Sequence, residues 1–115
     1  MKIRKANKKD AGVLKGLWIK SLENEKKLNN NIDLESEIKD FKKDFPKLFK
    51  ENNYFLADIN GNIAGFIGGE IKIGRGFFKN KRIGIIHALF VEEKYRNRGI
   101  GTELKKFLIS LILTI

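Results

Sequence analysis

The chain has 115 residues, and its 24 Lys and Arg against 14 Asp and Glu give a formal net charge of +10 at pH 7. This length suits one domain with a hydrophobic core and is too short for two domains of ordinary size. The absence of Cys and the presence of one His exclude a disulfide framework, a thiolate nucleophile and a zinc finger, and we expect no metal. The positive charge indicates an anionic partner, but charge alone does not distinguish nucleic acid, a membrane surface, an acidic protein and a phosphorylated small molecule.

The sequence argues against secretion and membrane insertion. Its basic N-terminus lacks the apolar run that follows the charges of a secretory signal. The longest apolar stretch, residues 107–115, includes two polar residues, and a membrane-spanning helix needs about 20 residues. We therefore expect a cytoplasmic protein with no membrane contact.

The N-terminal part predicts a short strand followed by two helices. Asn7 and Asp10 have the three-residue spacing of a capping box. Apolar residues then recur every three or four positions from residue 11, which indicates an amphipathic helix of about four turns that ends in a polar loop over residues 23–31. Asp33 is expected to cap a second helix, and Pro46 to end or bend it before a short turn of helix.

The middle of the chain has a strand pattern. Residues 54–59 and 63–73 are separated by Asn60 and Gly61, a pair typical of a two-residue type I′ hairpin turn because both residues need positive φ. Three glycines in the second strand indicate a bulge or a close backbone approach: Gly65, Gly68 and Gly69.

A third apolar run, residues 83–91, is continuous enough to predict a central strand covered on both faces. The basic loop before it, residues 74–82, is expected to be solvated, with contact to a phosphate or an acidic substrate as the alternative. A final helix is predicted from about Thr102. The order strand, helix, helix, three strands, helix predicts an α/β (α+β) fold with a mixed, mostly antiparallel sheet and helices on both faces.

The segment between the third apolar run and the last helix is the most informative about function. A helix N-terminus offers unpaired N–H groups and a partial positive charge of about half an elementary charge, which suits a phosphate. Gly99 and Gly101 allow the backbone to approach an anion, and Arg96 and Arg98 add full charges. The segment is not a Walker A loop, because no Lys follows Gly101, and it lacks the third Gly of a dinucleotide fingerprint. We predict a phosphate or pyrophosphate site.

Residues 96–101, RNRGIG, resemble the cofactor motif of the GNAT superfamily of acyl-CoA-dependent N-acyltransferases: Arg or Gln, two residues, Gly, one residue, then Gly or Ala. The resemblance extends to the strand end and Tyr95 before the motif, to the opening IRKANKKD, and to YFLADINGNIAGFIGG, which is similar to the family's second and third strands. It implies a single N-acetyltransferase domain over residues 1–115 that lacks the usual C-terminal strands and is incomplete at the C-terminus.

The resemblance implies an enzyme that moves an acetyl group from acetyl-CoA to a primary amine acceptor by direct attack on the thioester. The backbone of Leu89, Phe90 and Val91 would bind the pantetheine arm and the acetyl carbonyl. Backbone amides of the following loop would wrap the pyrophosphate of coenzyme A, from the residues Arg96, Asn97, Arg98, Gly99, Ile100, Gly101 and Thr102.

His87 is the candidate catalytic residue. Many relatives carry a Glu four to six residues before the position of Val91, and His87 is the residue in that stretch here that titrates. Histidine side chains ordinarily have a pKa of about 6.5, which suits proton transfer near neutrality. The alternative is that His87 packs in the sheet and donates one hydrogen bond.

Two further expectations concern partners. The last helix, FLISLILTI, is apolar nearly all round and requires burial on more than one side, so we expect a homodimer through it. The alternative to an enzyme is a basic binding module, which holds coenzyme A without turnover or contacts nucleic acid. Nucleic acid is disfavoured because no predicted strand interleaves aromatic and basic residues.

Overall fold

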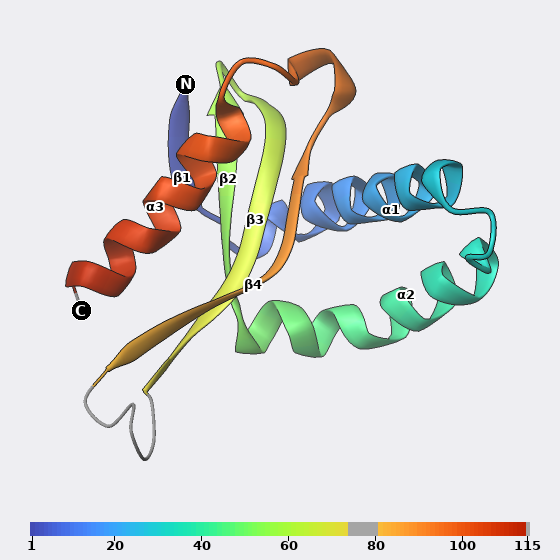
Figure 1. Ribbon diagram of the computed structural model, residues 1–115, viewed down its shortest axis with the longest axis horizontal. Helices are drawn as coiled ribbons and strands as arrows, with labels where there is room; N and C mark the ends of the chain where they lie inside the picture. The colour runs from blue at the N-terminus through green and yellow to red at the C-terminus, as the bar shows by residue number, and fades with distance from the viewer. Residues whose placement is uncertain (74–80, 115) are drawn as a thin grey trace.

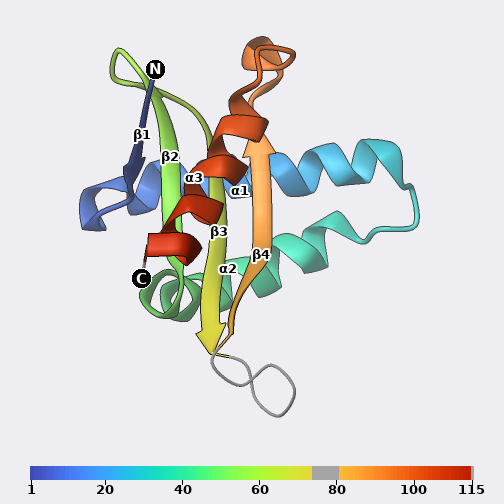
Figure 2. The same cartoon turned by 60° about the vertical axis from the view of Figure 1, so that its left-hand side comes forward.

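The computed structural model describes residues 1–73 and 81–114. A four-stranded sheet carries helices α1 and α2 on one face and α3 on the other (Figures 1 and 2). In chain order the elements are β1 (Lys2–Lys5), the 3-10 turn η1 (Lys8–Asp10), α1 (Ala11–Leu28), α2 (Leu34–Glu51), β2 (Asn53–Ile59), β3 (Asn62–Ile73), β4 (Arg82–Val91), the 3-10 turn η3 (Glu93–Tyr95) and α3 (Ile100–Thr114). The α/β fold with an antiparallel sheet and helices on both faces is confirmed.

The strands lie in the sheet in chain order, and each is antiparallel to its neighbour. In the described part of the chain β4 is therefore an edge strand, so the expectation of a central strand covered on both faces was wrong. Ile83 is 38% exposed and Ile86 is 47% exposed. An apolar run indicates that a strand tolerates burial. Whether the strand is central or at the edge depends on the order of the strands in the sheet, which the run does not specify.

A bulge in β4 confirms the expectation drawn from the glycines of β3. Gly68 pairs with Ala88 and Gly69 pairs with Ile86, so His87 is the extra residue between two ladder positions. The backbones approach closely here. A Cβ would overlap atoms of a neighbouring residue at each of the three glycines, Gly65, Gly68 and Gly69.

The hairpin between β2 and β3 has the expected turn. Asn60 has φ of 52° and Gly61 has φ of 89°, as a two-residue turn with both central residues left-handed requires. The Asp58 carboxylate accepts a hydrogen bond of 2.7 Å from the Gly61 N–H, so the side chain before the turn also stabilises it.

The start of α1 follows the prediction, but its end does not. Asn7 and Asp10 form the expected capping box. The helix then continues to Leu28, so the expected loop from residue 23 begins later. Lys26 donates hydrogen bonds of 2.9 and 2.6 Å to the carbonyls of Asn30 and Ile32, which ties the following loop to the last turn of this helix.

The second helix is capped by Asp33, whose carboxylate accepts from the Ser36 N–H at 3.2 Å. It continues through Pro46 to Glu51, so Pro46 does not end it, and the separate turn expected after the proline is its last turn. Phe45 and Phe49 lie on either side of the proline with ring centroids 5.6 Å apart. Their packing fixes the helix across a residue that lacks an N–H donor.

Each face of the sheet has its own core. On the α1 and α2 face an aromatic cluster surrounds Trp18, whose ring lies 4.9 Å from Phe41 and 5.5 Å from Phe66, centroid to centroid. On the other face Leu104 and Leu108 of α3 are buried against the strands. The two faces together fix the position of β4, because its alternating side chains enter both cores.

Arg4 on β1 joins three parts of the chain. Its guanidinium donates to both carboxylate oxygens of Asp10, at 2.8 and 2.9 Å, and to Asp58 at 3.2 Å. The hydrogen bonds from Arg4 lower the pKa of Asp10 below its ordinary value of 3.8, against the opposing effect of burial. A hydrogen bond from the Gly61 N–H lowers the pKa of Asp58, and a hydrogen bond from Arg4 lowers it further by a smaller amount.

We expect Arg4→Met to lower the free energy of unfolding at pH 7 by about 1 to 2 kcal/mol, because the Asp10 carboxylate then loses its charged donor. A lowered folded-state pKa stabilises above the ordinary pKa, and the contribution is lost as pH falls through the folded value. The difference between variant and wild type should therefore shrink at pH 3. Urea unfolding at both pH values measures it. Lys5→Met, an exposed cation on the same strand, is the matched control, and a loss as large in the control would contradict the prediction.

Candidate functional site

A sharply turning loop leads from β4 into α3. Asn97 has φ of 65° and Gly99 has φ of 77°, and the Gly99 carbonyl accepts the first helical hydrogen bond, 3.0 Å from the Glu103 nitrogen. The N–H groups of the first turn of a helix have no intrahelical acceptor and point out of its end. This loop therefore presents several backbone donors and the positive end of the helix dipole to the space before α3.

A cavity of about 350 Å³ lies at this helix end. Six of the seven predicted loop residues line it, and Arg98 does not. Lys105 also lines it and is not among the residues predicted from the sequence. One helical turn separates Lys105 from Thr102, and that spacing was the available signal. The lining residues are Val91, Tyr95, Arg96, Asn97, Gly99, Ile100, Gly101, Thr102 and Lys105.

The two arginines of the motif have different contacts. Arg96 donates from Nε to the Val91 carbonyl at 2.8 Å, and its guanidinium carbon lies 5.5 Å from the centroid of the Phe90 ring. Arg98 lies over the ring of Tyr95, 5.7 Å from its centroid. Arg96 thus fastens the loop to the end of β4, and Arg98 packs against the ring of Tyr95.

The end of β4 is held from both faces. Phe90 belongs to the aromatic cluster under α1 and α2, and Leu89 and Val91 pack in the cluster under α3. On one side the backbone pairs with β3. In the described part of the chain no strand pairs with the other side, so a rigid strand edge runs up to the loop. The predicted residues Leu89, Phe90 and Val91 therefore adjoin the loop residues.

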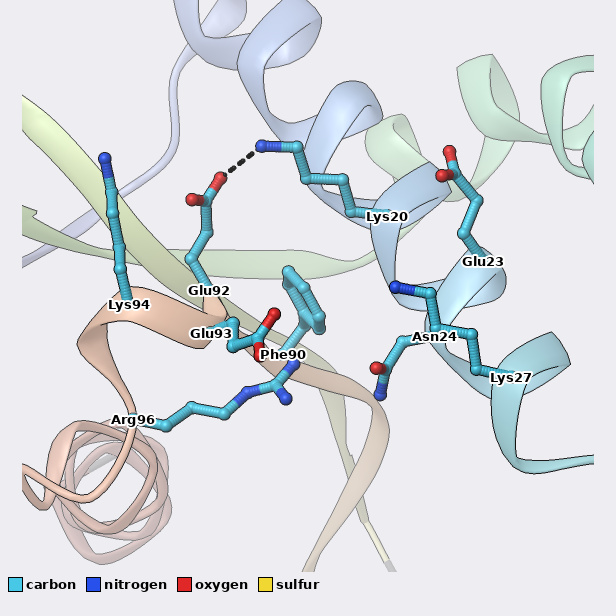
Figure 3. A pocket seen from close by; sticks show the side chains of 9 residues that line it. All are labelled: Lys20, Glu23, Asn24, Lys27, Phe90, Glu92, Glu93, Lys94 and Arg96. Carbon is cyan, nitrogen blue, oxygen red and sulfur yellow. Dashed lines mark hydrogen bonds and ion pairs between the residues drawn. The ribbon is translucent and has the colours of Figure 1, made fainter.

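A second cavity, of about 460 Å³, lies between α1 and the end of β4 (Figure 3). Phe90 and Arg96 line it, and Arg96 also lines the first cavity, so the two adjoin. Lys20 of α1 reaches across to Glu92, with Nζ 2.7 Å from Oε1. The full lining is Lys20, Glu23, Asn24, Lys27, Phe90, Glu92, Glu93, Lys94 and Arg96. No local pattern in the sequence indicates the ion pair of Lys20 and Glu92, because 72 residues separate the two.

His87 lies apart from both cavities, in the bulge of β4. Its Nε2 is 3.2 Å from Oε1 of Glu70, and the Lys72 ammonium is 3.2 Å from the same oxygen. The His87 side chain is 38% exposed. Phe90 lies three positions further along the strand, about 10 Å away at the rise of an extended chain. Glu70 is a residue near the site that sequence reasoning missed.

Within residues 1–73 and 81–114, no group of three or more His, Cys, Asp or Glu residues is able to hold a metal ion, and no helix is long and apolar enough to cross a membrane. Most of the basic loop over residues 74–82, which is expected to be solvated, lies outside the described residues. The alternative, contact with a phosphate or an acidic substrate, falls on the same residues.

Comparison with known proteins identifies relatives along most of the chain. Residues 19–113 match the model of the acetyltransferase (GNAT) family. An uncharacterized N-acetyltransferase of Archaeoglobus fulgidus is 28% identical over 110 residues, which cover 90% of this chain and 68% of that protein.

Solved structures share the fold. An acetyltransferase from Vibrio fischeri has a TM-score of 0.77 at 18% identity, covering 98% of this chain and 87% of that one. A protein of Clostridium acetobutylicum, described as a predicted acetyltransferase and solved with acetyl-CoA, has a TM-score of 0.65 at 22% identity, covering 96% of this chain and 71% of that one.

The geometry of the loop generates a test that needs no ligand. Gly99 has positive φ, and a Cβ added there would meet no other atom within 4 Å. We therefore expect Gly99→Ala to lower the free energy of unfolding by about 1 kcal/mol through backbone strain alone. Gly101 lies inside α3 without positive φ, and Gly101→Ala should leave stability unchanged or raise it by up to about 1 kcal/mol. Urea unfolding of both variants measures the contrast, and equal effects would show that the left-handed turn is not a constraint.

Proposed function

This chain belongs to the acetyltransferase (GNAT) family, and we propose that it moves the acetyl group of acetyl-CoA to a primary amine. The observation that carries the proposal is the cavity at the start of α3, which six residues of the predicted cofactor loop line together. The Clostridium acetobutylicum structure was determined with acetyl-CoA, and an aminoglycoside N-acetyltransferase with a TM-score of 0.60 was determined in complex with CoA.

The loop is suited to the pyrophosphate of coenzyme A. Unpaired N–H groups at the α3 N-terminus donate to phosphate oxygens, and the helix dipole favours their negative charge. Arg96 and Lys105 line the same cavity and supply two full positive charges. Gly99 and Gly101 leave the approach of the anion unobstructed by side chains.

The outer edge of β4 is suited to the pantetheine arm. This arm is extended and carries amide groups, so it forms hydrogen bonds with a strand edge as an added strand does. The backbone of Leu89, Phe90 and Val91 would hold it, with the thioester beside the second cavity. An N–H group of this edge would donate to the carbonyl oxygen as negative charge develops on it.

The acceptor amine would enter through the second cavity. Its nitrogen attacks the thioester carbon, a C–N bond forms, and the oxygen becomes an oxyanion. The C–S bond then breaks, the amide product forms, and the sulfur leaves as a thiolate that takes up a proton. The nitrogen gives up a proton in the same sequence, and we propose His87 as its acceptor.

Three other expectations from the sequence stay predictions: the incomplete C-terminus of the domain, the cytoplasmic location and the homodimer. The dimer has a defined surface to test. Ile109 is 52% exposed and Leu113 is 78% exposed on α3, whereas Leu104 and Leu108 of the same helix are buried.

We expect self-association to depend on this exposed stripe. Ile109→Lys with Leu113→Glu should shift the protein toward monomer in a light-scattering concentration series, because two charges then face the partner. The control is Lys105→Glu with Lys106→Glu, at exposed positions of the same helix. This variant changes the charge of the helix and leaves the apolar stripe intact. A wild type that stays monomeric throughout would contradict the prediction.

The cofactor assignment is tested by calorimetric titration with acetyl-CoA. Gly99→Asp and Gly99→Asn share their shape and their tolerance of positive φ, and they differ in one negative charge at the helix start. We expect the Asp variant to bind at least about tenfold more weakly than the Asn variant, a difference of about 1.4 kcal/mol.

Two outcomes contradict different parts of the proposal. Absence of binding by the wild type would remove acetyl-CoA as the donor. Equal binding by the Asp and Asn variants would show that the cofactor's phosphates lie elsewhere than at the α3 N-terminus. Circular dichroism of each variant verifies that the fold is retained.

A further inference from the structure

We propose that Glu70 is a positioning residue that orients His87 and fixes its tautomer, so that Nδ1 of His87 accepts the proton of the amine. The inference deepens the proposed function and rests on it. The contact that carries it is the 3.2 Å approach of His87 Nε2 to Glu70 Oε1, across the β3 and β4 pair.

The bulge gives His87 a position of its own. Gly68 and Gly69 pair with Ala88 and Ile86, so His87 has no direct ladder partner. The two β3 residues opposite the bulge are thus glycines, which carry no side chain. The imidazole turns toward the next side chain along β3, which is that of Glu70. The same glycines that permit the bulge therefore bring this histidine and this carboxylate together.

The carboxylate selects one tautomer of the imidazole. An ionised carboxylate accepts hydrogen bonds and donates none, so it favours the form of His87 with its proton on Nε2. Nδ1 then carries the lone pair. A histidine without such a partner exchanges between two tautomers and several rotamers, and only some of these present a basic nitrogen in a fixed direction.

The proton balance of this step is simple. The nitrogen of the attacking amine loses a proton as the C–N bond forms, and water molecules between the second cavity and the bulge pass it on to Nδ1. Nε2 keeps its proton, and the imidazole becomes a cation. The neighbouring Glu70 carboxylate stabilises that cation through its charge. The proton on Nδ1 then passes to solvent, which returns His87 to the neutral form.

Lys72 is the competing partner of the carboxylate. Its ammonium is 3.2 Å from the same Oε1 that faces His87, so two cationic or donating groups share one oxygen. Lys72 is 59% exposed against 38% for His87, and solvent weakens an exposed ion pair. Lys72 is therefore the weaker partner, and the Glu70 carboxylate stays beside the imidazole without it.

The tautomer is measured directly, because His87 is the only histidine of the chain. Nitrogen-15 NMR of the ring in the chain of residues 1–115 at pH 8 should show a larger share of the Nε2–H form than a free histidine side chain does at the same pH. In Glu70→Ala we expect the populations to move toward those of a free histidine side chain. Glu70→Gln keeps an oxygen acceptor and should retain more of the wild-type distribution. Lys72→Met should leave the tautomer unchanged.

Kinetics test the role in the reaction. With acetyl-CoA and butylamine, spermidine or a lysine-containing peptide as acceptors, release of the coenzyme A thiol gives kcat and KM. We expect His87→Ala and Glu70→Ala each to lower kcat about tenfold or more and to leave KM for acetyl-CoA unchanged. Glu70→Gln should recover part of the lost kcat. Lys72→Met should have the kcat of the wild type.

The outcomes separate this inference from the function on which it rests. If the wild type binds or turns over no acetyl-CoA, the proposed function fails, whatever the tautomer shows. If the wild type is active and His87→Ala or Glu70→Ala retains its kcat, or Glu70→Ala leaves the tautomer unchanged, the positioning role is overturned. A rise in KM with constant kcat would equally overturn it, because it would indicate a structural effect on cofactor binding.

Discussion

The pairing of β4 with β3 is the interaction on which the candidate site depends. Most residues assigned to the site lie on β4, follow it along the chain or, like Glu70, face it from β3. The exceptions are the α1 residues that line the second cavity: Lys20, Glu23, Asn24 and Lys27. The register of this one pair therefore fixes where the strand edge, the bulge and the start of α3 lie. Two glycines of β3, Gly65 and Gly69, make that register possible, because a Cβ at either would overlap a backbone carbonyl of β4.

An edge strand such as β4 fixes the positions of these site residues only if the strand itself is rigid. Side chains of β4 alternate between two cores, so Phe90 is held among aromatic rings while Leu89 and Val91 are held beneath α3. Arg96 then fastens the loop back to the carbonyl of Val91. A polar edge supported in this way loses little conformational freedom when an extended ligand pairs with it, and this favours binding.

Local features of the fold were predictable from the sequence, and non-local ones were not. The Asn7 and Asp10 capping box, the Asn60 and Gly61 turn and the glycine loop before α3 each depend on a few adjacent residues. The edge position of β4 and the pairs formed by Lys20 and by His87 depend on which segments meet in space. Pro46 stays helical for the same reason, since aromatic packing on both sides of it outweighs its local preference.

The net charge of +10 is informative only once its positions are known. Arg4, Lys20 and Lys72 are engaged by carboxylates, and Lys26 holds the loop after α1 through two carbonyls. The partners of these four cations are known, so they are not free for an anionic ligand in the way that the net charge alone suggests. The cations that we propose to act on a phosphate at the start of α3 are the ones that line the cavity there, Arg96 and Lys105. A basic composition therefore predicts an anionic ligand much less specifically than two cations beside a helix N-terminus do.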